Sequence, residues 1–163
     1  PSSRLFQEIR ERRGLAYSVS SFLELQPGFG AFGAYVGTRP ERVAVAVDVL
    51  GAELRKVAAG EVTAEDLGWA REHVAGRLGL SLETAGGRAT LLAGRLASGL
   101  DVVAPDVLTA EIAAVDEAAL HAVAAATLGN LEHAAIACVA PDAAGASAAL
   151  DAAALATSAV ATS

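Results

Sequence analysis

Apolar positions recur every three to four residues over most of the chain, which is the spacing of amphipathic helices. The clearest such run is residues 43–57, with Thr38 and Glu41 ahead of it as a capping box. On the first helix, Glu8 precedes Arg12 by four residues, the spacing of a favourable ion pair. Together the patterns predict helices over residues 2–13, 43–57, 63–78, 85–98, 105–113 and 116–128.

A period of two replaces the helical spacing between residues 16 and 37. The segment AYSVSSFLEL is followed by the turn signal QPG and then by FGAFGAYVG, which predicts a β-hairpin. The glycines of the second segment leave room for a large side chain or another backbone to approach closely. A third apolar run, HAAIACVA at residues 133–140, predicts a late, buried strand.

The order of these elements indicates an α+β fold, with a mostly antiparallel sheet and helices packed on one face. We expect the domain to occupy residues 1–140, and the Ala-rich residues 141–163 to form a tail outside the core. Three strands are few for a sheet that serves so many helices, so part of the domain is expected to be missing before residue 1.

Composition narrows the class of protein. Hydrophobic residues make up 53% of the 163 positions, which is enough for a core, while the net charge of −7 argues against a nucleic-acid partner. The single cysteine, Cys138, permits no internal disulfide, as is typical of a reducing compartment, and its apolar surroundings predict a buried, inert thiol. Neither a signal peptide nor a bilayer-spanning stretch is apparent, so we expect a cytoplasmic protein with no membrane partner.

One segment, WAREH at residues 69–73, comes close to a zinc motif. In His-x-x-Glu-His both histidines bind the metal, and here Glu72 and His73 are present but Trp69 stands at the first ligand position. Indole cannot ligate zinc, and neither of the other histidines completes a site, so we assign no metal to this chain. Trp69 and His73 are interpreted as a pair on a helix surface or at an interface.

The segment EIRERRGLAYSV carries the remaining candidates. Gly14 interrupts it, so Arg10 lies in the last helical turn and Tyr17 at the start of the following strand, where both can face one cleft. A guanidinium offers five donors and a phenol one hydroxyl, and both suit the carbonyl groups of an extended peptide. From spacing alone, core packing for Tyr17 and solvation for Arg10 are the commoner roles. A solvated face is likewise the ordinary role of Arg12 and Arg13.

Three blocks of the sequence resemble the C-terminal half of the pitrilysin-type zinc peptidases, the inverzincin family that includes insulin-degrading enzyme and mitochondrial processing peptidase. They are SSRLFQEIRERRGLAYSVSS, GFGAFGAYVGTRPERV and VTAEDLGWAREHVAGRL, within a likeness that runs from residue 2 to about residue 140. The block SRLFQEIRE-x-RGLAYSV is the most specific of them. The resemblance implies two homologous α+β halves around a chamber, with His-x-x-Glu-His and zinc in the first half and no metal in the second.

The same resemblance gives roles to residues of this chain. The family's metal-free half supplies an Arg and a Tyr to the substrate, and these match Arg10 and Tyr17, with Tyr17 as the catalytic candidate and both as substrate-binding residues. Arg12 and Arg13 are then helix surface. There is one departure: in the family this half begins with a strand and a helix ahead of the SSRLF block, and both are absent here, as is the zinc half.

Two functions follow from the resemblance. In the first, the chain is the substrate-binding, non-metal half of a zinc-dependent endopeptidase that acts on extended peptides, and it is inactive alone. In the alternative, it belongs to a non-catalytic assembly or binding subunit homologous to such peptidases. The presence of both Arg10 and Tyr17 favours the first. The expected partners are a zinc-bearing half or subunit, a peptide substrate and a second copy of the chain, with zinc held in the missing half and no cofactor in this one.

Overall fold

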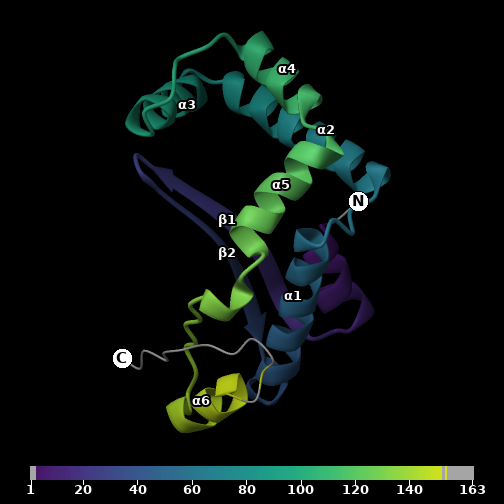
Figure 1. The fold of residues 1–163 in the computed structure, drawn as a ribbon. Coiled ribbons are helices and arrows are strands. Elements are labelled where there is room, and N and C mark those ends of the chain that lie inside the picture. Colours follow the sequence, from purple (N-terminus) through teal and green to yellow (C-terminus); the bar gives the residue numbers. More distant parts are fainter. Residues whose placement is uncertain (1–2, 152, 154–163) are drawn as a thin grey trace. The chain divides into compact units, whose positions relative to one another are not determined.

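A computed structural model describes residues 3–151 and residue 153 (Figure 1). The chain forms two compact units. The first contains the chain up to Phe22, Gly33–Glu61 and the residues from His121 onward, and the second contains Leu23–Phe32 and Val62–Leu120. The predicted α+β class is confirmed, because helices are combined with one antiparallel sheet of two strands. Among the described helices, none has the length and apolar character needed to cross a membrane.

The first unit begins with a helix whose turns are wider than those of an α-helix. This π-helix, η1, spans Phe6–Arg12, and Ile9 on its inner side is fully buried. Gly14 follows with a left-handed φ of 58°, which glycine adopts at little cost, so it ends the helix as predicted. The predicted ion pair between Glu8 and Arg12 is also confirmed.

Strands β1 (Ala16–Gln26) and β2 (Phe29–Thr38) form the predicted hairpin, with Gly28 in the turn at a φ of 75°. The glycines of β2 admit large side chains, as expected, because a Cβ placed on Gly33 would lie 2.2 Å from Cζ of Phe22. The base of the hairpin packs on the core cluster of the first unit. That cluster consists of Ile9, Leu15, Ala16 and Ala46, with Leu5, Val19, Val36, Val49 and Leu50 packed against it.

Helix α1 (Val43–Ala58) follows the short 3-10 helix η2 (Pro40–Arg42), but the predicted capping box is wrong. Thr38 is the last residue of β2, and its hydroxyl donates to the Leu15 carbonyl oxygen at 2.5 Å. The extended Arg39 then separates Thr38 from the helix, because the residue before a proline is held out of the helical conformation.

The second half of α1 carries a buried carboxylate. Glu53 is only 4% exposed, and its oxygens accept from Lys56 Nζ at 2.6 Å and from the Arg4 guanidinium at 3.5 Å. Arg4 also donates to the carbonyl oxygen of Glu61, just beyond the helix. These contacts attach the segment before η1 to both α1 and the loop after it.

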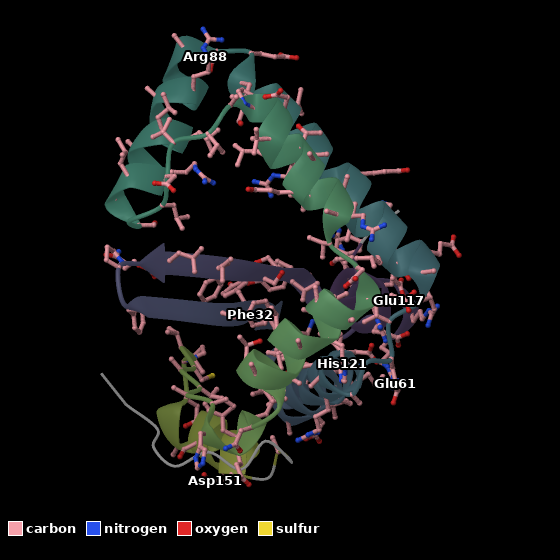
Figure 2. The ribbon with its side chains drawn as sticks, turned by 45° about the horizontal axis from the view of Figure 1, so that its top comes forward. Phe32, Glu61, Arg88, Glu117, His121 and Asp151 are labelled. Atoms are coloured by element: carbon pink, nitrogen blue, oxygen red, sulfur yellow. The ribbon has the colours of Figure 1, made fainter. Side chains whose placement is uncertain are left out.

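Helix α5 spans Glu117–Leu128, and its residues from His121 onward belong to the first unit. The imidazole of His121 lies against Gly60, where a Cβ would be 3.2 Å from Cδ2 of the ring, and Figure 2 shows His121 close to Glu61. Gly60 has a φ of 80°, so the loop after α1 turns sharply beneath this ring. Ala124 and Leu128 of the same helix are buried.

Residues 134–140 do not form a strand, so the predicted late, buried strand is wrong. They follow the short helix η3 (Leu131–His133) without regular secondary structure, Val139 is fully exposed, and Cys138 is only half-buried. A strand needs a neighbour to pair its backbone groups, and within the described residues the sheet contains only β1 and β2. The hydrophobic composition of this run was therefore a poor guide to its conformation.

Helix α6 (Ala143–Asp151) lies in the segment expected to be a tail. It packs against α1, and Leu150 is only 2% exposed. This part of the segment therefore contributes to the core of the first unit. Residues 152 and 154–163 of the expected tail lie outside the described residues, and the domain boundary after residue 140 stays a prediction.

The second unit is built on α2 (Ala64–Leu82), with α3 (Ala85–Ala97) and α4 (Pro105–Ala114) packed against it. Thr63 and Asp66 form a complete capping box at the start of α2, because each side chain accepts from the backbone N–H of the other. The predicted helices of this region are thus confirmed, with ends within a few residues of those expected.

Candidate functional site

Arg10 is placed by the buried residue before it. Ile9 is anchored in the core, so the next side chain on η1 points outward, and Arg10 is exposed. Two backbone bonds close the end of the helix beneath it, from Gly14 N–H to the Arg10 carbonyl oxygen at 3.2 Å and from Leu15 N–H to the Ile9 carbonyl oxygen at 2.8 Å. The backbone that carries Arg10 is therefore held on both sides.

The three arginines in η1 and directly after it, Arg10, Arg12 and Arg13, have different partners. Arg12 and Arg13 both pair with the Glu8 carboxylate. Arg10 instead lies over the ring of Phe6, with its Cζ 4.8 Å from the ring centroid, and it has no ion pair among the described residues. A cation–π contact orients the guanidinium without using its N–H donors, so Arg10 keeps them for another acceptor.

Tyr17 stands at the point where β1 leaves the core. The two residues before it, Leu15 and Ala16, are buried, whereas Tyr17 itself is 70% exposed. Its ring lies against the backbone of β2, because a Cβ placed on Gly37 would be 2.7 Å from Tyr17 Cζ and 2.9 Å from its hydroxyl oxygen. Packing in the core, the commoner role of a tyrosine near a strand start, is therefore not the role of Tyr17.

The phenol of Tyr35 on β2 raises the pKa of Tyr17 above its usual value of 10.0, first through hydrogen bonding and second through the charge that Tyr35 carries when it is ionised. Tyr35 is also exposed, which leaves both hydroxyls open to a ligand.

The structure places Arg10 and Tyr17 on one short, anchored segment of the first unit, but with separate partners. Arg10 contacts Phe6, and the ring of Tyr17 lies against Gly37. Their joint action on a substrate stays a prediction. Tyr35 was not singled out from the sequence, although one signal was present: it lies between two glycines of β2, on a strand expected to receive large side chains.

The WAREH segment lies on α2, in the second unit. Trp69 and His73 stack with their ring centroids 5.2 Å apart and their planes 20° from parallel, which agrees with their interpretation as a surface pair. Across the residues with described positions, no group of three or more His, Cys, Asp and Glu side chains could hold a metal ion.

Comparison with known proteins places these residues in a family context. Residues 1–73 match the model of the peptidase M16 inactive domain, a range that includes Arg10, Tyr17 and Tyr35. An uncharacterized zinc protease of Streptomyces coelicolor is 37% identical over 129 residues, which are 79% of this chain and 28% of that protein. An uncharacterized zinc protease of Mycobacterium tuberculosis is 44% identical over 91 residues, 56% of this chain and 21% of that protein.

A third relative, the uncharacterized zinc protease YmxG of Bacillus subtilis, is 35% identical over 83 residues, which are 51% of this chain and 20% of that protein. The chain thus spans between a fifth and about a quarter of the length of these relatives. The family suggested by the sequence blocks is confirmed by these matches.

Proposed function

This chain belongs to the M16 (pitrilysin-type) peptidases as a domain of their inactive, C-terminal type, and from that premise we propose that it is the half that binds the substrate of a zinc-dependent endopeptidase. The substrate would be an extended peptide. The cleavage chemistry would come from zinc in a homologous half, on the same polypeptide or on a partner subunit.

One observation carries this proposal. Arg10 and Tyr17 are both exposed, although the residues that hold their backbone, Ile9 and Leu15, are buried. Polar side chains fixed on an anchored backbone are the usual construction of a binding site, because little entropy is lost when they engage a ligand. The core residues around them supply the rigidity, and the two side chains supply the donors.

The two residues would act on different parts of the peptide. The Tyr17 hydroxyl would donate to the oxygen of the scissile carbonyl as negative charge develops on it, a bond that strengthens in the transition state. Arg10, with its fork of N–H donors oriented by Phe6, would hold a backbone carbonyl beyond the cut. The peptide would lie extended, adding to the edge of a sheet in the zinc-bearing half.

The alternative is a non-catalytic subunit that binds peptides or assembles with an active peptidase. The matched family model describes an inactive domain, and this description suits either function. A His-x-x-Glu-His motif encoded upstream in the same gene, or in a neighbouring one, would favour the peptidase. Its absence from both would favour the binding subunit.

The test is steady-state kinetics on the assembled peptidase, with the zinc half present. Tyr17→Phe should lower kcat by about 10²–10³-fold, the usual cost of losing one oxyanion donor, and change KM little. Arg10→Ala should lower kcat and raise KM. Arg12→Ala is the matched control, because Arg12 pairs with Glu8 on the same helix, and it should change neither value much.

Two results would contradict the assignment. If Arg12→Ala were as damaging as Arg10→Ala, the arginines would be acting through the net charge of η1. If Tyr17→Phe were without effect, the hydroxyl of Tyr17 would have no part in the reaction, and the proposal would lose its catalytic residue.

A further inference from the structure

Two arginines of η1 contact the side chain four positions before them, the spacing at which side chains are neighbours on a helix surface. For Arg12 that side chain is Glu8, whose carboxylate accepts from the guanidinium. For Arg10 it is Phe6, whose ring presents its π face to the guanidinium, with Arg10 Cζ 4.8 Å from the ring centroid. The same helix thus holds one arginine with its donors engaged and one with its donors available.

The backbone that carries Phe6 is anchored like that of Arg10. The preceding residue, Leu5, packs against the core cluster, and Ile9 of the same helix is fully buried. The Phe6 N–H donates to Ser3 Oγ at 3.4 Å, and the ring itself is half-buried. Phe6 therefore offers a fixed surface next to a long, exposed side chain.

Such a surface changes what Arg10 loses when it binds a ligand. An arginine side chain has much rotamer freedom, and immobilising it opposes binding. Contact with an aromatic ring removes part of that freedom beforehand and leaves the N–H groups unused. A carboxylate at position 6 would also restrain Arg10, but it would occupy the donors that a peptide carbonyl needs, as Glu8 does for Arg12.

We propose that Phe6 is a positioning residue for Arg10. Its ring holds the guanidinium ready for a backbone carbonyl of the peptide, and an aromatic residue in place of an acidic one keeps the donors available. This inference deepens the proposed function and rests on it. It is also consistent with the form of η1, since π-helical turns occur frequently at functional sites.

The first test needs no peptidase activity. In the nuclear magnetic resonance spectrum of the chain, the ring current of Phe6 should shift the δ-methylene and Nε protons of Arg10 upfield of those of Arg12. Phe6→Leu should abolish this difference, because it keeps an apolar side chain but removes the ring. Arg10 resonances that are identical in wild type and Phe6→Leu would overturn the inference.

The second test uses the assembled peptidase and one fluorogenic peptide that the wild-type enzyme cleaves. Phe6→Glu should reproduce the raised KM and lowered kcat of Arg10→Ala, although the arginine is still present, because the new carboxylate would occupy its donors. Glu8→Gln is the matched control: it weakens the pairing of Arg12 and Arg13 and should change neither value much. Wild-type kinetics of Phe6→Glu would overturn the inference.

A third test separates the charge of the ring face from its shape. Phenylalanines with one to three ring fluorines, incorporated at position 6, weaken the negative face of the ring and nearly conserve its size. KM should rise stepwise along this series, to about two- to fivefold, the scale of an exposed cation–π contact. A constant KM would show a merely structural role for Phe6 and would overturn the proposal. If circular dichroism showed that Phe6→Glu does not fold, this series would decide alone.

The outcomes also separate this inference from the function on which it rests. If Arg10→Ala raises KM and the fluorinated series does not, the positioning role of Phe6 fails and the proposed function stands. If Arg10→Ala itself leaves KM and kcat unchanged, the role proposed for Arg10 fails, and that of Phe6 fails with it, whatever the resonance shifts show.

Discussion

The two units of this chain are stabilised differently. In the first unit, residues from η1, β1, α1, α5 and α6 are buried, and Ile9 and Leu150 are almost wholly removed from solvent. In the second unit, Leu67 and Leu108 are the buried hydrophobic residues among those described. Several large apolar side chains of this unit are exposed, namely Val74, Leu80, Leu92, Leu96, Leu100, Val107 and Val115.

This difference explains where the candidate site lies. A binding residue needs a backbone that does not move when the ligand arrives, and buried neighbours provide one. Arg10 and Tyr17 directly follow the buried Ile9 and Ala16, whereas the stacked Trp69 and His73 lie on a helix of the second unit that buries only Leu67. The first unit is therefore suited to recognition, whereas in the second unit α2 and α3 begin with the capping threonines Thr63 and Thr84.

The largest effect expected on stability is that of Ile9→Ala. Ile9 is fully buried beneath the segment that carries Arg10, so its truncation leaves a cavity and should lower the free energy of unfolding by about 2–5 kcal/mol. Leu96→Ala, at an exposed position of the second unit, should change it by less than about 0.5 kcal/mol. Chemical denaturation followed by circular dichroism compares the two. Equal losses would show that the units do not differ as described.

A smaller effect is expected for Glu53→Gln. The amide cannot accept both charge-assisted bonds, from Lys56 and from Arg4, and the loss should be about 1–3 kcal/mol. Glu72→Gln is the control, since Glu72 is an exposed carboxylate on α2 of the second unit. The melting temperatures of the two variants provide the comparison. If Glu53→Gln melted at the wild-type temperature, its buried ion pair would not contribute to holding the first unit together.

The smallest effect expected concerns the second unit alone. Thr63→Ala removes one side of the capping box of α2 and should cost about 1 kcal/mol. Thr109→Ala is the matched control, because the Thr109 hydroxyl bonds a carbonyl within its own helix and its loss should matter little. Hydrogen exchange of the α2 amides would detect the change. Unchanged protection in Thr63→Ala would mean that packing, rather than capping, stabilises this helix.

The sequence predicted most elements whose signals are local, although the local signal for a capping box at Thr38 and Glu41 was misleading. The hairpin, the glycine that ends η1 and the start of a helix near residue 63 follow from residues within a few positions of one another, and all three are confirmed. The late strand was predicted wrongly because strand formation depends on a partner elsewhere in the chain. The burial of Leu150 was missed for the same reason, since an Ala-rich segment shows little periodicity and its packing depends on α1.

The residues of the candidate site also differ in whether nearby sequence reveals them. Arg10 and Tyr17 were found through a motif in one continuous segment, and the glycine between them indicated that they belong to different elements. Tyr35 could not be found like this, because its effect on the pKa of Tyr17 depends on how β1 and β2 are paired. A pairing register fixes which side chains meet across a hairpin, and spacing along the chain does not reveal it directly.

The measurement that tests the central claim most directly is the affinity of the assembled peptidase for two ligands, with and without the Tyr17 hydroxyl. One ligand is a substrate peptide, bound under conditions in which it is not cleaved, and the other is an analogue with a tetrahedral, charged centre at the scissile position. We expect Tyr17→Phe to weaken binding of the analogue by about 10²-fold or more and to leave the affinity for the substrate nearly unchanged. Equal weakening of both ligands, or no weakening of either, would contradict the claim that Tyr17 stabilises the charge that develops on the peptide carbonyl.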